Sequence, residues 1–420
     1  MTDESVATPR SAFPWYLTSS SLWMAAMSLQ GFLITWMLVG ILETPPEIVG
    51  YGRMLMEMPP LVVLLLGGVV ADRVDGRTLL TGMHVVVALP PLAIAAVVAY
   101  DGLTFWSVIA FGIAVAMVQA ISDPARQSLL SRVARIDIQR TVTLMTIVTS
   151  LVGLGGVWLG GRIDQLGLAT VLVLQSLCFF VGAAAVRQLP SYPVRSASRT
   201  DFFAGVKAVW RHALIRDIIG LNFLSSLFNA GAYVVAVPFI VKDVYGGDAA
   251  FFSTVILVFT AGSIGSNVLL LKFMPLLRPG RLFILMQLTR VAILAVLWMR
   301  PSLWLFYVAI VAWGFNMGIT TTLVRTTVQE LAEEPNRAQI LSILLLSFMI
   351  SAPASSVLLG WLIAGYDPLT ALVPGIAMSL LIFAFGSATK GLWRYEAPDA
   401  LRARRIAASL APRTSEGKTS

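Results

Sequence analysis

Apolar residues recur along the chain in runs long enough to cross a bilayer, separated by polar breaks. A spanning helix needs about 20 mostly apolar residues, because each residue lengthens a helix by about 1.5 Å. The pattern predicts twelve such helices, at residues 20–42, 48–71, 78–99, 103–125, 139–161, 167–187, 217–241, 249–272, 281–299, 302–324, 338–364 and 368–388.

The longest polar break divides six predicted helices from six. The expected parts are an N-terminal tail, a six-helix bundle, a linker, a second six-helix bundle and a disordered tail, at residues 1–17, 18–187, 188–216, 217–388 and 389–420. From Asp201 to Arg216 the linker is apolar on one helical face and carries Lys207 and Arg211 on another. This pattern is typical of a helix that lies at the membrane interface.

Composition agrees with lipid as the main solvent. Hydrophobic residues make up 57% of the 420 residues and charged residues only 12%, whereas a soluble domain carries about 25% charged residues. The sequence therefore predicts an all-α integral membrane protein, with lipid around most of the chain.

The positive net charge of +8 is unevenly placed. Most Lys and Arg residues lie in segments that share a side with both termini, while the opposite loops hold only Arg162, Lys242 and Arg300. Cytoplasmic loops carry such an excess, so we expect both termini in the cytoplasm and the protein in the bacterial inner membrane. This topology explains the charge without a nucleic-acid partner.

Residues for catalysis or metal binding are scarce. The chain has one cysteine, Cys178, and two histidines, His84 and His212. It lacks the Gly-rich phosphate-binding motif of P-loop proteins, and no Cys/His cluster suits zinc. We therefore expect neither an enzyme nor a cofactor, and the expected contacts are the lipid bilayer and small solutes.

Two short similarities relate the halves to each other. Gln127 and Leu129 after the fourth run correspond to Gln329 and Leu331 after the tenth, and a Gly-Arg pair precedes both the third and ninth runs. Parallel repeats of six helices around a central linker are typical of transporters.

Residues 67–77, GGVVADRVDGR, place glycine and charge at the cytoplasmic end of the second predicted helix. Gly68, Asp72, Arg73 and Arg77 resemble the signature between spans two and three of the major facilitator superfamily. The resemblance covers essentially the whole chain, and the sequence is most similar to the bacterial branch of the enterobactin exporter and macrolide-type efflux proteins. The stretches that support this branch are residues 71–80, 122–130, 211–223 and 335–343.

The resemblance implies the twelve-helix major facilitator fold, in which two pseudo-repeated halves rock around a central site in a functional monomer. It also places Asp72 at a cytoplasmic gate, where Arg126 is its best-matched partner and Asp123 fits the same role. The alternative is that these charges only fix the topology, although the positive-inside rule accounts for the arginines and not for Asp72.

Two departures from the family pattern affect this hypothesis. Asp75 and Gly76 stand where the common motif has a glycine and an arginine, and the missing arginine softens the gate. Residues 156–161, GVWLGG, lack the proline of an antiporter signature, which weakens the case for antiport. Gly156 and Gly160 still form a GxxxG face for close helix packing.

Ionisable residues inside a membrane are costly and therefore indicate function. Arg53 and Glu57 lie four residues apart in the second run, so their side chains can meet. Glu57 is the candidate for exchanging a proton for substrate, and the alternative is a local ion pair between the two residues.

Arg290 lies mid-way in the ninth run and has two interpretations: it binds an anionic group of a substrate or braces neighbouring helices. Eight neutral polar residues either line a central cavity or hold helices together through hydrogen bonds. They are Gln30, Gln119, Gln175, Asn222, Asn229, Asn267, Gln287 and Asn316, of which Gln30, Asn222, Asn229 and Asn316 are the cavity candidates.

These patterns together predict a secondary transporter that works by alternating access. We expect proton-coupled efflux of a small amphipathic molecule, such as a drug-like compound or a siderophore. The alternatives are an importer, a facilitator or a lysolipid flippase of the same fold, and a membrane sensor or scaffold that does not transport.

Overall fold

The computed structural model describes residues 9–71, 74–133, 138–191, 202–333, 336–389, 391–398 and 401–402. These residues form helices and short connections, with no strand among them, so the predicted all-α class is confirmed. In this part of the chain, ten helices are long and apolar enough to cross a membrane. Two further predicted spans fall on α2 and α5, which are 26 and 23 residues long.

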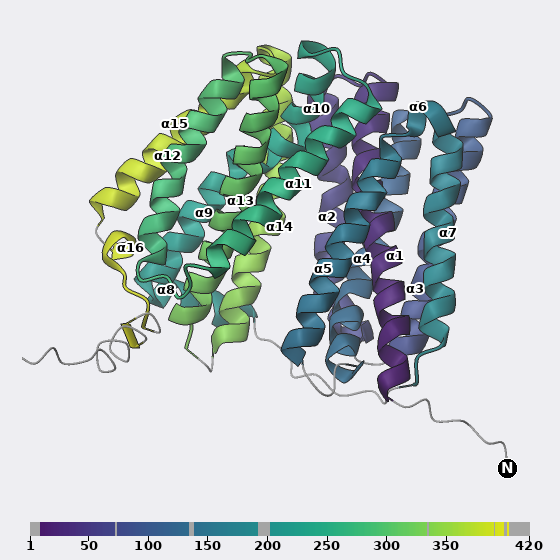
Figure 1. Cartoon of the computed structure of the whole chain (residues 1–420), viewed down its shortest axis with the longest axis horizontal. Helices are drawn as coiled ribbons and strands as arrows, with labels where there is room; N and C mark the ends of the chain where they lie inside the picture. The colour runs from purple at the N-terminus through teal and green to yellow at the C-terminus, as the bar shows by residue number, and fades with distance from the viewer. Residues whose placement is uncertain are drawn as a thin grey trace, which may run out of the picture. The chain divides into compact units, whose positions relative to one another are not determined.

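Figure 1 labels most of the helices. In the first part of the chain they are α1 (Pro9–Trp36), η1 (Met37–Ile41), α2 (Pro46–Ala71), α3 (Gly76–Ala99), α4 (Phe105–Val133), α5 (Ile138–Gly160), α6 (Ile163–Leu166), α7 (Leu168–Arg187) and α8 (Phe202–Arg211). They continue with α9 (Ala213–Gly231), η2 (Ala232–Ala236), α10 (Val237–Phe239), η3 (Ile240–Val244), α11 (Ala249–Leu271), α12 (Pro279–Trp298), α13 (Leu303–Leu331), α14 (Arg337–Gly365), η5 (Thr370–Leu372), α15 (Val373–Ala388) and α16 (Gly391–Arg394).

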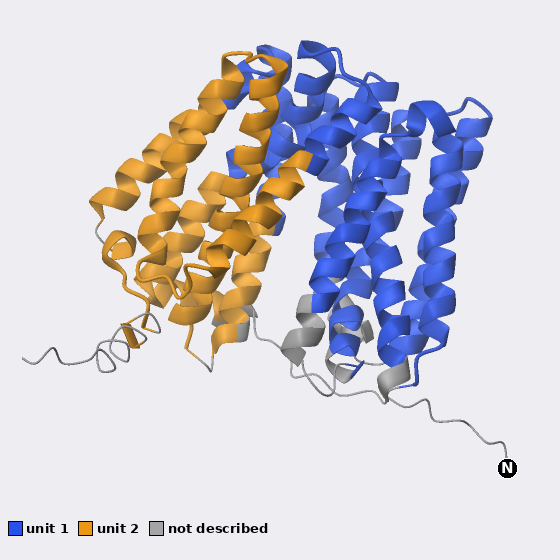
Figure 2. Ribbon diagram, viewed as in Figure 1, with its two compact units in different colours: residues 1–199, 226–257, 349–372 blue, residues 200–225, 258–348, 373–420 orange. Residues whose placement is uncertain are grey.

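The chain divides into two compact units, which Figure 2 colours separately. Unit 1 comprises residues 1–199, 226–257 and 349–372, and unit 2 comprises residues 200–225, 258–348 and 373–420. Helices α9, α11 and α14 each contribute residues to both units. The division into two sequential six-helix halves stays a prediction.

Helix α1 is central to the packing of unit 1. It packs against α5 and α7, while α3 packs against α4 and α7. One apolar core of this unit consists of Ala12, Tyr16, Leu79, Leu80, Ala125, Leu129, Val133, Met145, Val186 and Leu189. This core surrounds the start of α3, where Asp75 caps the helix by accepting a hydrogen bond from the Thr78 backbone N–H at 3.1 Å.

Segments 226–257 and 349–372 also pack on the N-terminal helices within unit 1. The Phe252 ring stacks on Trp36 with centroids 5.6 Å apart. The Lys242 ammonium lies 3.0 Å from the Glu43 carboxylate and donates to the Val39 carbonyl.

Glycines bring helix backbones close together in the same region. A Cβ on Gly360 of α14 would lie 2.5 Å from the Pro46 carbonyl oxygen of α2. A Cβ on Gly50 of α2 would lie 2.5 Å from the Ser356 carbonyl oxygen of α14. Real Cβ atoms do not approach oxygen this closely, so glycine is required at both positions.

Unit 2 has its own core, to which α8, α9, α12, α13, α14, α15 and α16 contribute side chains. Its buried members are Val209, Ile215, Ile218, Ile219, Leu221, Phe283, Ile284, Ile319, Leu323, Val324, Val328, Ala332, Ile340, Leu344, Ile382 and Leu392. Val209 belongs to α8, so the short helix of the predicted linker is anchored on this unit.

Candidate functional site

Arg53 and Glu57 do not form the direct ion pair that their spacing allows. The Arg53 guanidinium donates from Nη2 to the hydroxyl of Thr35 on α1. Within the described residues Glu57 has no salt bridge, and its Oε2 is buried without a hydrogen-bond partner. The structure therefore leaves a half-buried carboxyl group in α2 that no cation directly neutralises.

Thr35 was not among the residues that the sequence marked for function. Its hydroxyl also donates to the Gly31 carbonyl at 2.9 Å, so the same oxygen is oriented to accept from Arg53. A threonine in an apolar helix gives no signal of such a contact in the sequence.

Arg290 lies in unit 2 with only 3% of its surface exposed, and its partners are all neutral. Its Nη2 donates to Asn316 Oδ1 at 3.0 Å and its Nε to the same oxygen at 3.3 Å. Further acceptors are Gln287, at 3.3 Å, and Ser225. Among the described residues no carboxylate pairs with Arg290, so a buried positive charge lacks a counter-ion.

Three helices supply this arrangement: Ser225 belongs to α9, Arg290 to α12 and Asn316 to α13. Asn316 is held in place because its Nδ2 donates to the Met286 carbonyl and to Thr289, both at 2.7 Å. On α9, Asn222 lies one turn before Ser225, and its Nδ2 is buried with no hydrogen-bond partner in the part of the chain that the structure describes. Ser225 is an addition to the residues that the sequence proposed, whereas Gln287 was already among its neutral polar residues.

The other two neutral candidates lie inside unit 1. Gln30 of α1 accepts a hydrogen bond from Gln175 of α7 at 2.6 Å, and both are buried. Gln175 also donates to the Ala26 carbonyl, so these side chains link two packed helices. Asn229 is 5% exposed and lies near the end of α9.

The proposed gate is described only in part. Gly68 lies in α2 and Arg77 in the first turn of α3, whereas Asp72 and Arg73 lie outside the described residues. Asp123 is in α4, three residues before Arg126, and no salt bridge joins them in the described structure.

Arg126 is held by groups on α1. Its guanidinium carbon lies 4.3 Å from the centre of the Trp23 ring, and its Nη1 donates to Ser20 Oγ at 3.5 Å. The Tyr16 hydroxyl donates to the Arg126 carbonyl at 2.7 Å. The Nε and Nη2 of Arg126 are buried with no partner in the described part of the chain, which leaves two donors for an acidic group.

His84 lies beside Arg126 and its contacts on α1, and the sequence did not mark it as a functional residue. Its Nδ1 lies 2.8 Å from the Leu80 carbonyl, which can only accept, so Nδ1 carries the proton. The other ring nitrogen then accepts from Ser19 at 3.1 Å, and the ring packs 5.0 Å from Trp23. A neutral histidine on α3 thus supports the aromatic ring over which Arg126 lies.

Gly156 and Gly160 face α1 in unit 1. A Cβ on Gly156 would lie 2.1 Å from the Ala25 carbonyl oxygen, and a Cβ on Gly160 would lie 2.4 Å from the Phe32 ring. Close contact between α5 and α1 therefore depends on both glycines.

Comparison with known proteins identifies the kind of molecule to which these sites belong. The family model described as transmembrane secretion effector matches residues 13–413. No match is found among curated proteins.

Solved structures agree in fold. The nucleoside transporter NupG superposes with a TM-score of 0.69 at 13% identity, over 93% of this chain and 100% of that one. A bacterial homologue of the iron transporter ferroportin, in an inward-facing state, gives 0.69 at 14% identity, over 90% and 98%. A bacterial homologue of the human lysosomal transporter Spinster, inward-facing and unoccupied, gives 0.65 at 13% identity, over 91% and 96%.

Proposed function

Because the chain belongs to the transmembrane secretion effector family, and so to the membrane transporters of the major facilitator superfamily, we propose that it exports a small amphipathic molecule in exchange for protons. The substrate is a drug-like compound or a siderophore, and both termini lie in the cytoplasm. The likeness of residues 71–80 and 122–130 to the enterobactin-exporter and macrolide-efflux branch supports export.

The observation that carries proton coupling is the carboxyl group of Glu57. An ionisable side chain in a spanning helix is costly unless it has a function or a partner. Arg53 instead donates to Thr35, and one Glu57 oxygen is buried without a hydrogen bond to any described residue. Such a carboxyl group can take up a proton and release it when substrate binds, since no tight ion pair fixes its charge.

Arg290 supports a substrate that bears an anionic group. The guanidinium is held by neutral acceptors on three helices and lacks a counter-ion in the described structure. A carboxylate or phosphate on the substrate would supply that charge. Asn222 and Asn316 would then contribute amide groups beside it, while Gln30 and Asn229 remain further candidates.

Arg126 supports a gate at the cytoplasmic side. Its two unpartnered donors suit Asp72, which follows α2 in the sequence. In this proposal Gly68, Arg73, Arg77 and Asp123 belong to the same gate, which closes and opens as the substrate site changes sides.

The test is transport by the purified protein in proteoliposomes under an imposed pH gradient, with lipophilic cations, siderophores and lysolipids as the panel. Glu57→Gln is compared with Glu47→Gln, which removes a carboxylate from the first turn of the same helix. We expect Glu57→Gln to abolish gradient-driven transport while binding of the transported compound persists, and Glu47→Gln to behave as the native protein. Native-like gradient-driven transport by Glu57→Gln would exclude the coupling role.

A further inference from the structure

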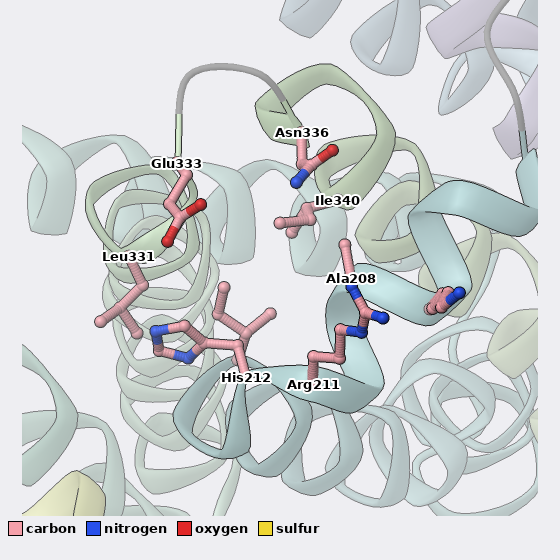
Figure 3. Close-up of a pocket in the computed structure, with 9 residues that line it drawn as sticks. Ala208, Arg211, His212, Leu331, Glu333, Asn336 and Ile340 are labelled. Atoms are coloured by element: carbon pink, nitrogen blue, oxygen red, sulfur yellow. The ribbon is translucent and has the colours of Figure 1, made fainter.

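Unit 2 contains a cavity of about 350 Å³ between the end of α8 and the neighbouring ends of α13 and α14. Figure 3 shows Arg211 and His212 on one side of it and Glu333, Asn336 and Ile340 on the other. Its lining consists of Lys207, Ala208, Arg211, His212, Ile215, Leu331, Glu333, Asn336 and Ile340. This volume lies within the range of about 300–1,000 Å³ that small-molecule sites occupy.

The basic wall of the cavity is fixed by packing. Helix α8 lies against the start of α14, where a Cβ on Gly205 would be 3.0 Å from the Gln339 carbonyl oxygen. Val209 and Ile215 are buried in the core of unit 2 on either side of the turn between α8 and α9. Lys207 and Arg211 are one helical turn apart, so both cations can reach the same space.

Among the described residues, the basic side chains that line this cavity lack side-chain partners, unlike three other arginines of unit 2. Arg278 bonds to Glu396 at 2.6 Å, Arg281 lies over the Trp393 ring and Arg216 pairs with Asp217. In the described structure, Lys207 and Arg211 have neither a salt bridge nor a side-chain hydrogen bond.

His212 adds a buried polar atom to this wall. Its Nδ1 is buried and has no hydrogen-bond partner in the described residues. Glu333 faces the cavity from the opposite side, yet it too forms no salt bridge within the described structure. Positive groups and a carboxylate thus line one space without neutralising each other.

We propose that this cavity binds a phosphate ester, with Arg211, Lys207 and His212 on the phosphate. Guanidinium and ammonium groups are the side chains that bind phosphate most strongly in proteins. Glu333 and Asn336 then accept hydrogen bonds from the hydroxyl or ammonium group that the rest of the ester carries. This division of roles explains why a carboxylate lies opposite the cations.

Two sources can supply this chemistry: a phospholipid head group and a soluble phosphate ester. Trp210, next to Arg211, is 67% exposed, and tryptophan is enriched at the level of lipid head groups. A basic pocket beside spanning helices is a known kind of head-group site. The experiment separates the two sources.

Binding is measured on the full-length protein in detergent, from the rise in unfolding temperature with increasing ligand. The probes are short-chain phosphatidylglycerol, short-chain phosphatidylethanolamine, glycerol 3-phosphate and inorganic phosphate. Arg211→Gln is compared with Lys272→Gln, which removes an exposed charge outside the cavity in the same unit, and with Arg211→Lys as the charge-retaining variant.

A head-group site predicts that either lipid binds saturably and that Arg211→Gln weakens this binding at least tenfold. Lys272→Gln should leave the binding unchanged, and Arg211→Lys should weaken it to an intermediate degree. The same pattern with glycerol 3-phosphate or inorganic phosphate supports a soluble ligand. If no probe binds, or if Arg211→Gln and Lys272→Gln weaken binding equally, the proposal is wrong. None of these outcomes depends on transport, so the result stands apart from the test of Glu57.

Discussion

Arg53 and Glu57 are one turn apart on α2, yet the Arg53 guanidinium bonds to Thr35 of α1, and no described residue pairs directly with the Glu57 carboxyl group. This arrangement links two helices through the arginine. It also separates the cation from the carboxyl group that we propose to carry protons. We therefore expect the hydrogen bond to Thr35 to hold Arg53 out of a direct ion pair with Glu57.

Replacing Thr35 with valine keeps the shape of the side chain and removes the acceptor for Arg53. We expect Arg53 to turn to Glu57, so that the carboxylate becomes paired and proton-driven transport falls about tenfold, equivalent to about 1.4 kcal/mol. The measurement is uptake in proteoliposomes under a pH gradient. Thr254→Val, at an exposed threonine that bonds only within its own helix, is the control. Undiminished transport by folded Thr35→Val would contradict this role.

The Asn316 amide oxygen accepts two hydrogen bonds from Arg290, so Asn316→Leu should be strongly destabilising. Hydrogen bonds to charged groups contribute about 1.5–3 kcal/mol each, and we expect a loss of about 3 kcal/mol. Thermal unfolding in detergent measures the loss. Asn267→Leu, at an exposed amide bonded to Thr322, should stay within about 0.5 kcal/mol of the native protein.

The double variant Arg290→Met/Asn316→Leu sharpens this prediction. Removing the charge together with its acceptor leaves no buried unpaired cation, so the double variant should be more stable than Asn316→Leu alone. If the two substitutions simply add, Arg290 does not depend on Asn316.

Gly155 and Gly156 are neighbours on α5 with opposite surroundings. A Cβ at Gly156 would meet the Ala25 carbonyl at 2.1 Å, whereas a Cβ at Gly155 has nothing within 4 Å. We expect Gly156→Ala to destabilise the protein by about 1–3 kcal/mol through overpacking. Gly155→Ala should stabilise it by up to about 1 kcal/mol, because alanine favours helix. Comparison of the two melting temperatures checks this, and equal effects would contradict it.

Gly360→Ala should weaken the contact between α14 and α2 in unit 1, since the added methyl group would lie 2.5 Å from the Pro46 carbonyl oxygen. The readout is the rate at which a maleimide labels Ser356→Cys, a 1% exposed position beside this contact, in a Cys178→Ala background. Overpacking of about 1–3 kcal/mol predicts a rise of about tenfold or more. Gly365→Ala, with open space around its Cβ, should leave the rate unchanged. If Gly360→Ala and Gly365→Ala give the same labelling rate, the contact between α14 and α2 accommodates the added methyl group and the prediction is wrong.

The helical class was predictable because a run of about 20 apolar residues has few other stable forms in lipid. The N-cap of α3 was also predictable, because Asp75 directly precedes the helix and aspartate is a preferred N-cap residue. Comparison with the family motif marked Asp75 only as a departure from that motif. Its hydrogen bond to Thr78 gives it a local structural role.

The side-chain partners were not predictable from the sequence. Spacing places Arg53 within reach of Glu57, but the choice of Thr35 depends on how closely α1 approaches α2. In the same way, Arg290 was expected either to bind an anion or to brace helices. Its partner Ser225 comes from packing between α9 and α12, whereas Gln287 lies three residues earlier on α12 itself. The Trp23 ring over which Arg126 lies is likewise a contact between distant parts of the chain.

The glycine contacts between α2 and α14 have a mechanical consequence. At Gly50 and Gly360 the surfaces that meet are main-chain atoms, and no large side chain from either position inserts into the opposite helix. Helices in contact through their main chains can separate without a change of side-chain rotamers, and their separation leaves no side-chain cavity to refill. We therefore expect α2 and α14 to separate and return to contact during the transport cycle with little side-chain rearrangement.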